Sequence, residues 1–292
     1  MIIYIEVLAM KFKLGCDPEL FVKNKAGALI SAHGLVPGDK INPSPVDKGA
    51  VQVDGMALEY NIEPSESLED FVSYNTSVLS SLKDMLPEDC DFDIKPVAEF
   101  GMELIQSQPE EARILGCEPD YNAYTGKVNV SPNAELDFRT ASGHIHIGWT
   151  EDQDIHSPEH FYTCCLLTQL LDKHLAAPAL LLEPRMQGVK RRKLYGKAGA
   201  FRPKPYGMEY RVLSNFWIKN PKLMAWVYNK VEDVMTNVVP VYKDTTIAEA
   251  YNGSGFNLVH GGVFRKVINR EGGWGHSLTS VATTLKEYRV SL

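Results

Sequence analysis

Three short units of the sequence place polar side chains two residues apart within apolar stretches. They are Asp17 with Glu19, His144 with His146, and Glu209 with Arg211. In a β-strand, residues i and i+2 project from the same face, so each unit predicts two neighbouring ligands on one side of a sheet. A fourth predicted strand carries Glu59, Asn61 and Glu63, with Asp54 nearby. Because carboxylates outnumber histidines here, the pattern favours Mg²⁺ or Mn²⁺, which prefer hard oxygen ligands, over zinc.

Each unit taken alone also has an ordinary structural explanation. Asp-Pro-Glu is typical of a turn, and Glu-x-Arg is typical of a solvated strand face. Two imidazoles on one sheet face are costly to bury without partners, so the His144–His146 unit favours a site more strongly. Four such units on one predicted sheet together predict a metal-binding site.

A basic segment precedes the Glu209–Arg211 unit. Residues 185–206 are expected to form a loop in which lysines and arginines, including Arg192, Lys193 and Arg202, alternate with glycines and aromatic residues. Neither a GxxxxGK[ST] loop nor a GxGxxG fingerprint is present, so phosphates would need cationic side chains from elsewhere. Arginine pairs well with phosphate oxygens, and we interpret the segment as nucleotide-binding. A nucleic-acid patch and a merely solvated basic loop are the alternatives.

A sheet is needed to bring these side chains together, and the sequence predicts one. Alternating patterns indicate strands in residues 11–24, 51–64, 91–100, 135–150 and 207–217, with a turn at Asp54-Gly55 in the second and a break at Gly143 in the fourth. Helices are predicted from Ser67 to Pro87, over residues 158–177, and from Asn220 through about Val238. Residues 34–45 read as loop, and the tail 245–292 as helical with glycine breaks.

Length and composition bound the remaining possibilities. A chain of 292 residues with 44% hydrophobic residues is predicted to form a single domain over residues 1–292. The formal net charge of -7 makes nucleic acid an unlikely partner. The five scattered cysteines favour a reducing cytoplasm. Residues 1–10 are apolar but too short to span a bilayer, so we expect an edge strand or a mis-assigned start, and no membrane association.

The order of these motifs resembles a known superfamily. An acidic pair, acidic residues on the next strand, a central His-x-His unit and a late E-x-R unit are similar to glutamine synthetase and γ-glutamylcysteine ligase. The segments GCDPELF, VQVDGMALEYNIEPS, GCEPDYNAY, SGHIHIG and LYGKAGAFRPKPYGMEYRVLSNFW more closely resemble the carboxylate–amine ligase family (COOH-NH2 ligase-type 2) of tailed phages. The resemblance implies an α+β fold, with a largely antiparallel curved sheet of the glutamine synthetase catalytic type and helices packed on one face.

The resemblance also implies roles for individual residues. Glu19 and Glu59 would hold one metal ion, with Glu63 or Asp54 as third ligand. Asp17, His144 and Glu209 would hold another ion nearer the nucleotide phosphates. The nucleotide or the transferred phosphoryl group would be contacted by the remaining predicted site residues, which are Arg211, Arg202, Arg192, Lys193 and His146. The first pair is Asp-x-Glu where glutamine synthetase has Glu-x-Glu, and the spacing of Glu59 and Glu63 also differs.

The implied activity is ATP-dependent ligation of a carboxylate and an amine through an acyl phosphate. Two or more Mg²⁺ ions, or Mn²⁺, would be needed, and the substrates would be small molecules or peptides. The resemblance is compatible with a homo-oligomer. We expect the protein in the cytoplasm, which would be that of the host cell if the chain is phage-encoded. The alternatives are a metal-dependent hydrolase, a guanidino phosphotransferase, and a non-catalytic nucleotide-binding or virion-associated protein with the same fold.

Overall fold

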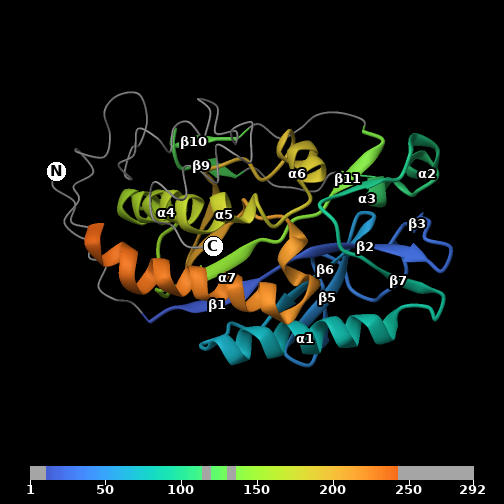
Figure 1. Cartoon of the computed structure of the whole chain (residues 1–292), viewed down its shortest axis with the longest axis horizontal. Helices are drawn as coiled ribbons and strands as arrows, with labels where there is room; N and C mark the ends of the chain where they lie inside the picture. The colour runs from blue at the N-terminus through green and yellow to red at the C-terminus, as the bar shows by residue number, and fades with distance from the viewer. Residues whose placement is uncertain (1–10, 114–119, 130–135, 243–292) are drawn as a thin grey trace.

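The computed structural model describes residues 11–113, 120–129 and 136–242 (Figure 1). Our expectations for residues 1–10 and for the tail 245–292 lie outside this part of the chain. None of the helices in the described part combines the length and apolarity that a bilayer crossing requires.

One antiparallel sheet is built mainly from the first third of the chain. Its strand order is β3 (Leu29–Ile30), β2 (Glu19–Asn24), β6 (Ala57–Ile62), β5 (Gly49–Asp54) and β4 (Ser44–Val46), and β7 (Cys90–Asp93) also pairs with β2. The hairpin predicted for residues 51–64 is confirmed as β5 and β6. Its turn begins where Asp54 pairs with Ala57, and Gly55 adopts a φ of 60° that glycine tolerates best.

A second antiparallel sheet joins strands from distant parts of the sequence. Its order is β1 (Lys13–Cys16), β12 (Ile145–Gly148), β14 (Gly207–Tyr210), β13 (Ala200–Lys204), β9 (Tyr121–Asn122) and β10 (Lys127–Val128). A small pair, β8 (Val97–Glu99) and β11 (Phe138–Thr140), lies apart from it. The break predicted at Gly143 is confirmed, because β11 and β12 flank it.

The two sheets are continuous at the kinked first strand. β1 and β2 are successive parts of one extended segment, interrupted at Asp17-Pro18 because proline has no amide hydrogen to donate to a sheet. Leu14 and Ser65 exchange backbone hydrogen bonds of 2.9 Å, which hold β1 beside the chain that leaves β6. The result is a curved, half-barrel arrangement.

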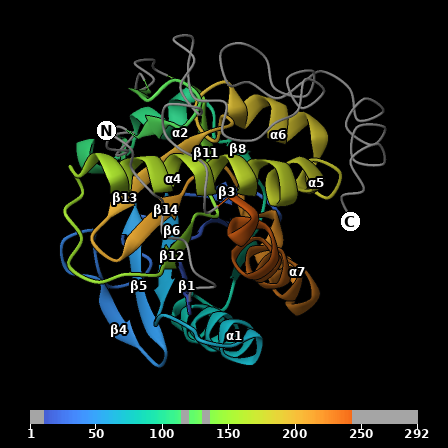
Figure 2. The ribbon, with the colours of Figure 1, turned by 90° about the vertical axis from the view of Figure 1, so that its left-hand side faces the viewer.

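Helices cover one face of the curved sheet. α1 (Leu68–Met85) begins where Ser67 accepts a hydrogen bond from the Asp70 amide, and it packs on β5 and β6. α4 (Pro158–Leu171) packs on β13 and β14 and continues as a π-helical segment, η1 (Asp172–Ala176), and the short α5 (Ala177–Ala179). α7 (Pro221–Asp233) continues into η3 (Val234–Val238) and lies beside α1 (Figure 2).

Shorter helices complete the described chain. They are α2 (Met102–Gln106), α3 (Glu110–Arg113), α6 (Arg185–Arg192), the 3-10 helix η2 (Asn215–Lys219) and the 3-10 helix η4 (Val239–Tyr242). The predicted α+β fold, with an antiparallel curved sheet, is confirmed.

Strand alternation separates the two faces of the sheet. Buried apolar residues such as Cys16, Ile145 and Tyr210 belong to the main hydrophobic core. The residues between them, including His146 and Glu209, therefore project from the opposite face. Charged side chains are thus concentrated on the face that the core helices leave open.

Three predicted boundaries are wrong. Residues 185–206 are not a loop, because they form α6 and β13. Three basic residues in the last turn of α6 interact favourably with the helix dipole, which offsets the charge run that suggested a loop. The strand predicted for 207–217 ends at Tyr210, and the one predicted for 91–100 is divided into β7 and β8.

Candidate active site

One row of the sheet aligns three of the predicted site residues. His146 on β12 is directly opposite Glu209 on β14, and Glu209 is directly opposite Arg202 on β13. Gly15 on β1 is the partner of His146 on the other side. Directly paired residues point to the same face, so the register alone places the imidazole, carboxylate and guanidinium side by side.

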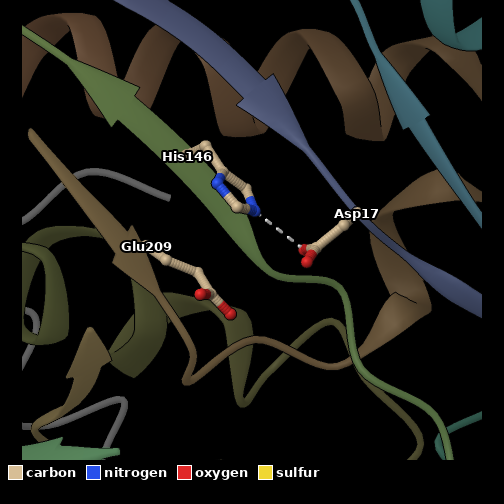
Figure 3. Close-up of side chains that lie close together, drawn as sticks. All are labelled: Asp17, His146 and Glu209. Carbon is tan, nitrogen blue, oxygen red and sulfur yellow. Dashed lines mark ion pairs between the residues drawn. The ribbon is translucent and has the colours of Figure 1, made fainter. Parts of the chain in front are cut away.

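Asp17, His146 and Glu209, which we call the Glu209 cluster, could together hold a metal ion (Figure 3). One ligand atom from each lies within 4.8 Å of the others. Asp17 Oδ1 is 3.2 Å from His146 Nε2. His144 Nδ1 lies 3.6 Å from Asp17 Oδ1 and 3.5 Å from Glu209 Oε1. The structure therefore places His146 in the cluster, while His144, the ligand that the resemblance implied, lies at its border.

Cationic side chains surround the carboxylate of Glu209. This side chain is 1% exposed, and Arg211 donates a hydrogen bond to Oε1. Arg202 and Lys204 each approach Oε2 to 3.3 Å. Burial on its own raises the pKa of Glu209, but Arg211 and the neighbouring histidines outweigh burial, so the pKa is lowered. These neighbours therefore favour the ionised form of Glu209, which is the form that binds a metal ion.

The two histidines have opposite pKa shifts. Burial lowers the pKa of His144 well below its usual value, and the positive charge of Arg211 lowers it further. Burial also disfavours the charged form of His146, but the adjacent Asp17 carboxylate outweighs burial and raises its pKa. A metal binds deprotonated imidazole, so the pKa shift of His144 favours ligation and that of His146 opposes it. His146 Nδ1 lies 2.5 Å from the hydroxyl of Tyr206.

Three acidic side chains form a second group, the Glu19 cluster, on the same face. Glu19 on β2 is directly opposite Glu59 on β6, and their ligand atoms lie within 4.8 Å of one of Asp54. The Ser142 amide donates to Glu19 Oε2 at 2.8 Å, and Gln52 Nε2 donates to Glu59 Oε2 at 2.9 Å. The registers of β2 with β6 and of β5 with β6 thus position all three acids.

Burial and mutual repulsion raise the pKa values in the Glu19 cluster. Burial, followed by the charge of Asp54, raises the pKa of Glu19 to about 7. Burial and the charges of Asp17 and Glu19 raise the pKa of Glu59 well above its usual value. A cation bound between these acids would offset their mutual repulsion and stabilise their ionised forms.

Glu63 lies apart from the Glu19 cluster. Its side chain is 60% exposed and 3.9 Å from Lys48, beyond the end of β6. Of the two candidates for third ligand, Asp54 is the one brought to Glu19 and Glu59. Lys40 forms an ion pair with Asp54 at 2.8 Å.

The basic residues of α6 lie in environments that the sequence did not predict. Arg192 pairs with Glu183, and Lys193 is exposed at the end of the helix. Their predicted nucleotide contacts stay predictions. The neighbouring Arg191 is 1% exposed instead, and it donates to the carbonyls of Val212 and Leu213 and to Ser142 Oγ.

Sequence reasoning missed Asp120, and it named Arg191 and Lys204 only as members of the basic segment, without a role of their own. Asp120 Oδ2 accepts a hydrogen bond from Arg211 Nε at 3.1 Å, which orients the guanidinium beside Glu209. Asp120 lies in the segment GCEPDYNAY that contributed to the family resemblance, so a signal was present. Arg191 carried no such signal, because a charge run gives no sign of which member is buried.

Both clusters fit a divalent metal ion. The Glu19 cluster offers three carboxylates, which suit Mg²⁺ or Mn²⁺, and the Glu209 cluster adds imidazole. Asp17 Oδ1 and His146 Nε2 are buried yet make no hydrogen bond of normal geometry, as expected of atoms that bind a further group.

A cavity of about 1150 Å³ opens beside the clusters. Its lining includes Asp17, Glu59, His146, Trp149 and Tyr206. Its size is sufficient for a nucleotide or a comparably large substrate.

No curated protein matches the chain significantly. The family comparison does give a match, over the part of the chain that holds both histidines, Arg202, Glu209 and Arg211. Residues 130–253 match the family described as phage phiEco32-like COOH.NH2 ligase-type 2, and the family identified from the sequence is thereby confirmed.

Proposed function

We propose that this protein is an ATP-dependent carboxylate–amine ligase that uses Mg²⁺ at both acidic clusters. The observation that carries the proposal is the position of the Glu19 and Glu209 clusters on one sheet face, with the cations Arg202, Lys204 and Arg211 around Glu209. Carboxylates hold divalent ions, and cations bind phosphate oxygens, so the arrangement suits a metal–nucleotide complex. The matched family is named for carboxylate–amine ligation.

The first chemical step would transfer the γ-phosphoryl group of ATP to an oxygen of the substrate carboxylate. The P–O bond to ADP breaks as the new P–O bond forms, which gives an acyl phosphate. When bound, the metal ions would neutralise charge on the phosphates. Arg202 and Arg211 would bind the transferred group, because their donors lie beside Glu209 and point to the same face.

The second step would form the amide bond. The amine nitrogen attacks the carbonyl carbon of the acyl phosphate, the C–O bond to phosphate breaks, and inorganic phosphate leaves while the nitrogen loses a proton. Water would hydrolyse the same intermediate, so the reaction needs a recessed site. The cavity beside Asp17, Glu59 and His146 supports this requirement.

The proposal is tested by ADP release from Mg-ATP in the presence of pools of carboxylates and amines. We expect release that requires one compound of each class and that is lost in Glu209→Gln, which keeps the shape of the side chain but not its charge. Glu103→Gln, an exchange of the same kind at an exposed residue of α2, serves as the matched surface control. Hydrolysis of a pool compound without ATP would instead establish the hydrolase alternative. Failure of the wild-type protein to bind ATP would refute the proposal.

A further inference from the structure

A fully buried carboxylate lies behind the sheet, outside both acidic clusters. Asp172 is 0% exposed and begins the π-helical segment Asp172–Ala176 that follows α4. A π-helical turn inserted in an α-helix is uncommon and often occurs where a functional side chain must be placed. Asp172 is therefore a buried ionisable group whose role needs an explanation.

Three donors from three separate segments converge on Asp172. Tyr210 donates its hydroxyl hydrogen to Oδ1 at 2.6 Å. Tyr124 donates its hydroxyl hydrogen to Oδ2 at 2.9 Å, and the Gly199 amide donates to the same oxygen at 2.7 Å. One side chain thus joins a helix to three parts of the sheet.

Each of these segments also carries a residue of the candidate site. Tyr210 lies between Glu209 and Arg211 on β14, and Gly199 immediately precedes β13, which carries Arg202. Tyr124 belongs to the short segment that begins with Asp120, the partner of Arg211. Strand alternation directs Tyr210 to the helix-covered face while its two neighbours face the site.

The packing around Asp172 leaves little freedom for movement. Gly199 has a φ of 83°, and a Cβ there would lie 2.7 Å from Tyr124 Cδ2. Burial raises the pKa of Asp172 to about 7, although the three hydrogen bonds act in the opposite direction. A carboxylate in this position costs free energy that an apolar residue would not cost, which favours a role beyond packing.

We propose that Asp172 is a positioning residue of the active site, which fixes Glu209, Arg211, Arg202 and Asp120 through its hydrogen bonds to Tyr210, Gly199 and Tyr124. The inference rests on the proposed function, because it assigns Asp172 to the same metal-binding and phosphate-binding side chains. Asp172 itself does not touch the reacting groups.

Tyr210→Phe tests this role more cleanly than a change of Asp172, which risks the fold. It removes the single hydrogen bond that links Asp172 to the strand of Glu209. Tyr60→Phe is the matched control, because Tyr60 is also buried, lies in a strand, and donates its hydroxyl hydrogen to a helix residue, Asn75, at 2.7 Å. Thermal unfolding of both variants compares their losses of stability.

Mn²⁺ affinity, measured by electron paramagnetic resonance, and amide hydrogen exchange of residues 207–213 provide two further measurements. We expect Tyr210→Phe to weaken binding of a Mn²⁺ ion by about tenfold, as for other changes behind a metal ligand, and to speed exchange in 207–213. Tyr60→Phe should leave exchange in 207–213 unchanged within about twofold, because the Tyr60 hydroxyl bonds to Asn75 on α1 and not to Asp172. In an Asp172→Leu background that still folds, Tyr210→Phe should add little, because a leucine side chain offers the Tyr210 hydroxyl no acceptor.

Unchanged Mn²⁺ affinity in Tyr210→Phe, or equal effects of Tyr210→Phe and Tyr60→Phe on exchange in 207–213, would overturn the inference. Its failure is distinguishable from failure of the proposed function. A wild-type protein that releases no ADP with any substrate and binds no ATP refutes the ligase. Even in that case, amide hydrogen exchange in Tyr210→Phe and Tyr60→Phe still tests whether Asp172 positions residues 207–213.

Discussion

Glu19 and Glu59 are direct partners across β2 and β6, so two carboxylates lie next to each other on the open face of the sheet. Burial and the nearby acids hold the pKa of Glu19 near 7, above its ordinary value of 4.5. The folded protein therefore binds a proton at this site more tightly than the unfolded chain does. The free energy of unfolding falls as the pH rises from about 4.5 to about 7, because the unfolded chain releases the proton first.

We predict that metal-free protein becomes less heat-stable between pH 5 and pH 8 and that Mg²⁺ restores stability at pH 8 but not at pH 5. The part due to Glu19 is on the order of 3 kcal/mol at most. Thermal unfolding with EDTA or Mg²⁺ measures it, and Glu19→Gln is the control because it keeps an oxygen for the Ser142 amide. If Glu19→Gln shows the same pH dependence as the wild type, repulsion at Glu19 is not the cause.

Asp54 and Glu63 offer a matched pair of variants for the third ligand of the Glu19 cluster. Asp54 lies with Glu19 and Glu59, whereas Glu63 is exposed and 3.9 Å from Lys48. Asp54→Asn should weaken Mn²⁺ binding by at least about tenfold, and Glu63→Gln should have little effect. Titration of Mn²⁺ by electron paramagnetic resonance measures both, and the reverse ranking would make Glu63 the ligand.

Arg191 is predicted to be essential for stability although it belongs to a charge run. Its guanidinium donates to the Val212 and Leu213 carbonyls, which Arg191→Met would leave buried without this partner. A hydrogen bond to a charged group contributes about 1.5–3 kcal/mol, so we expect the loss of both to cost roughly 3 kcal/mol or more. Urea unfolding measures the change, with the half-exposed Lys190→Met as the control. A loss below about 1 kcal/mol for Arg191→Met would contradict the role that its contacts indicate.

Variants of Arg202 and Lys193 distinguish two possible binding sites for the nucleotide phosphates, one beside Glu209 and one at the end of α6. Arg202 lies 3.3 Å from Glu209, while Lys193 is exposed at the end of α6. A charge-assisted hydrogen bond contributes about 1.5–3 kcal/mol, so Arg202→Gln should weaken Mg-ATP binding by about tenfold or more. Lys193→Gln should change it less than twofold if the phosphates lie beside Glu209. Calorimetric titration measures both, and a larger loss in Lys193→Gln would move the phosphates toward α6.

Much of the sheet could be predicted from local sequence patterns. Period-two alternation identified the strands around Asp17, His146 and Glu209, and Ser67 and Pro87 marked the ends of α1. The register between strands could not be predicted, because His146, Glu209 and Arg202 are brought together by pairing between segments that are distant in the sequence. The family resemblance, rather than the residue spacing, implied the grouping of Glu19 with Glu59 and of Asp17 with His144 and Glu209.

The basic segment shows why the remaining features were missed. In the sequence, Arg191, Arg192 and Lys193 are equivalent cations, but one helical turn directs them to different environments. Arg191 is buried against backbone carbonyls, Arg192 pairs with Glu183, and Lys193 is exposed. Which of the three is buried depends on the packing of α6 against the chain that follows β14, and no local pattern encodes that contact.

The transfer of oxygen from carboxylate to phosphate tests the central claim most directly. With a carboxylate and an amine that support ADP release, the carboxylate is labelled with oxygen-18 and the released phosphate is analysed by mass spectrometry. Activation through an acyl phosphate predicts that one labelled oxygen per turnover appears in inorganic phosphate, since the C–O bond to phosphate breaks when the amine attacks. Phosphate without label, alongside amide formation, would contradict the proposed mechanism.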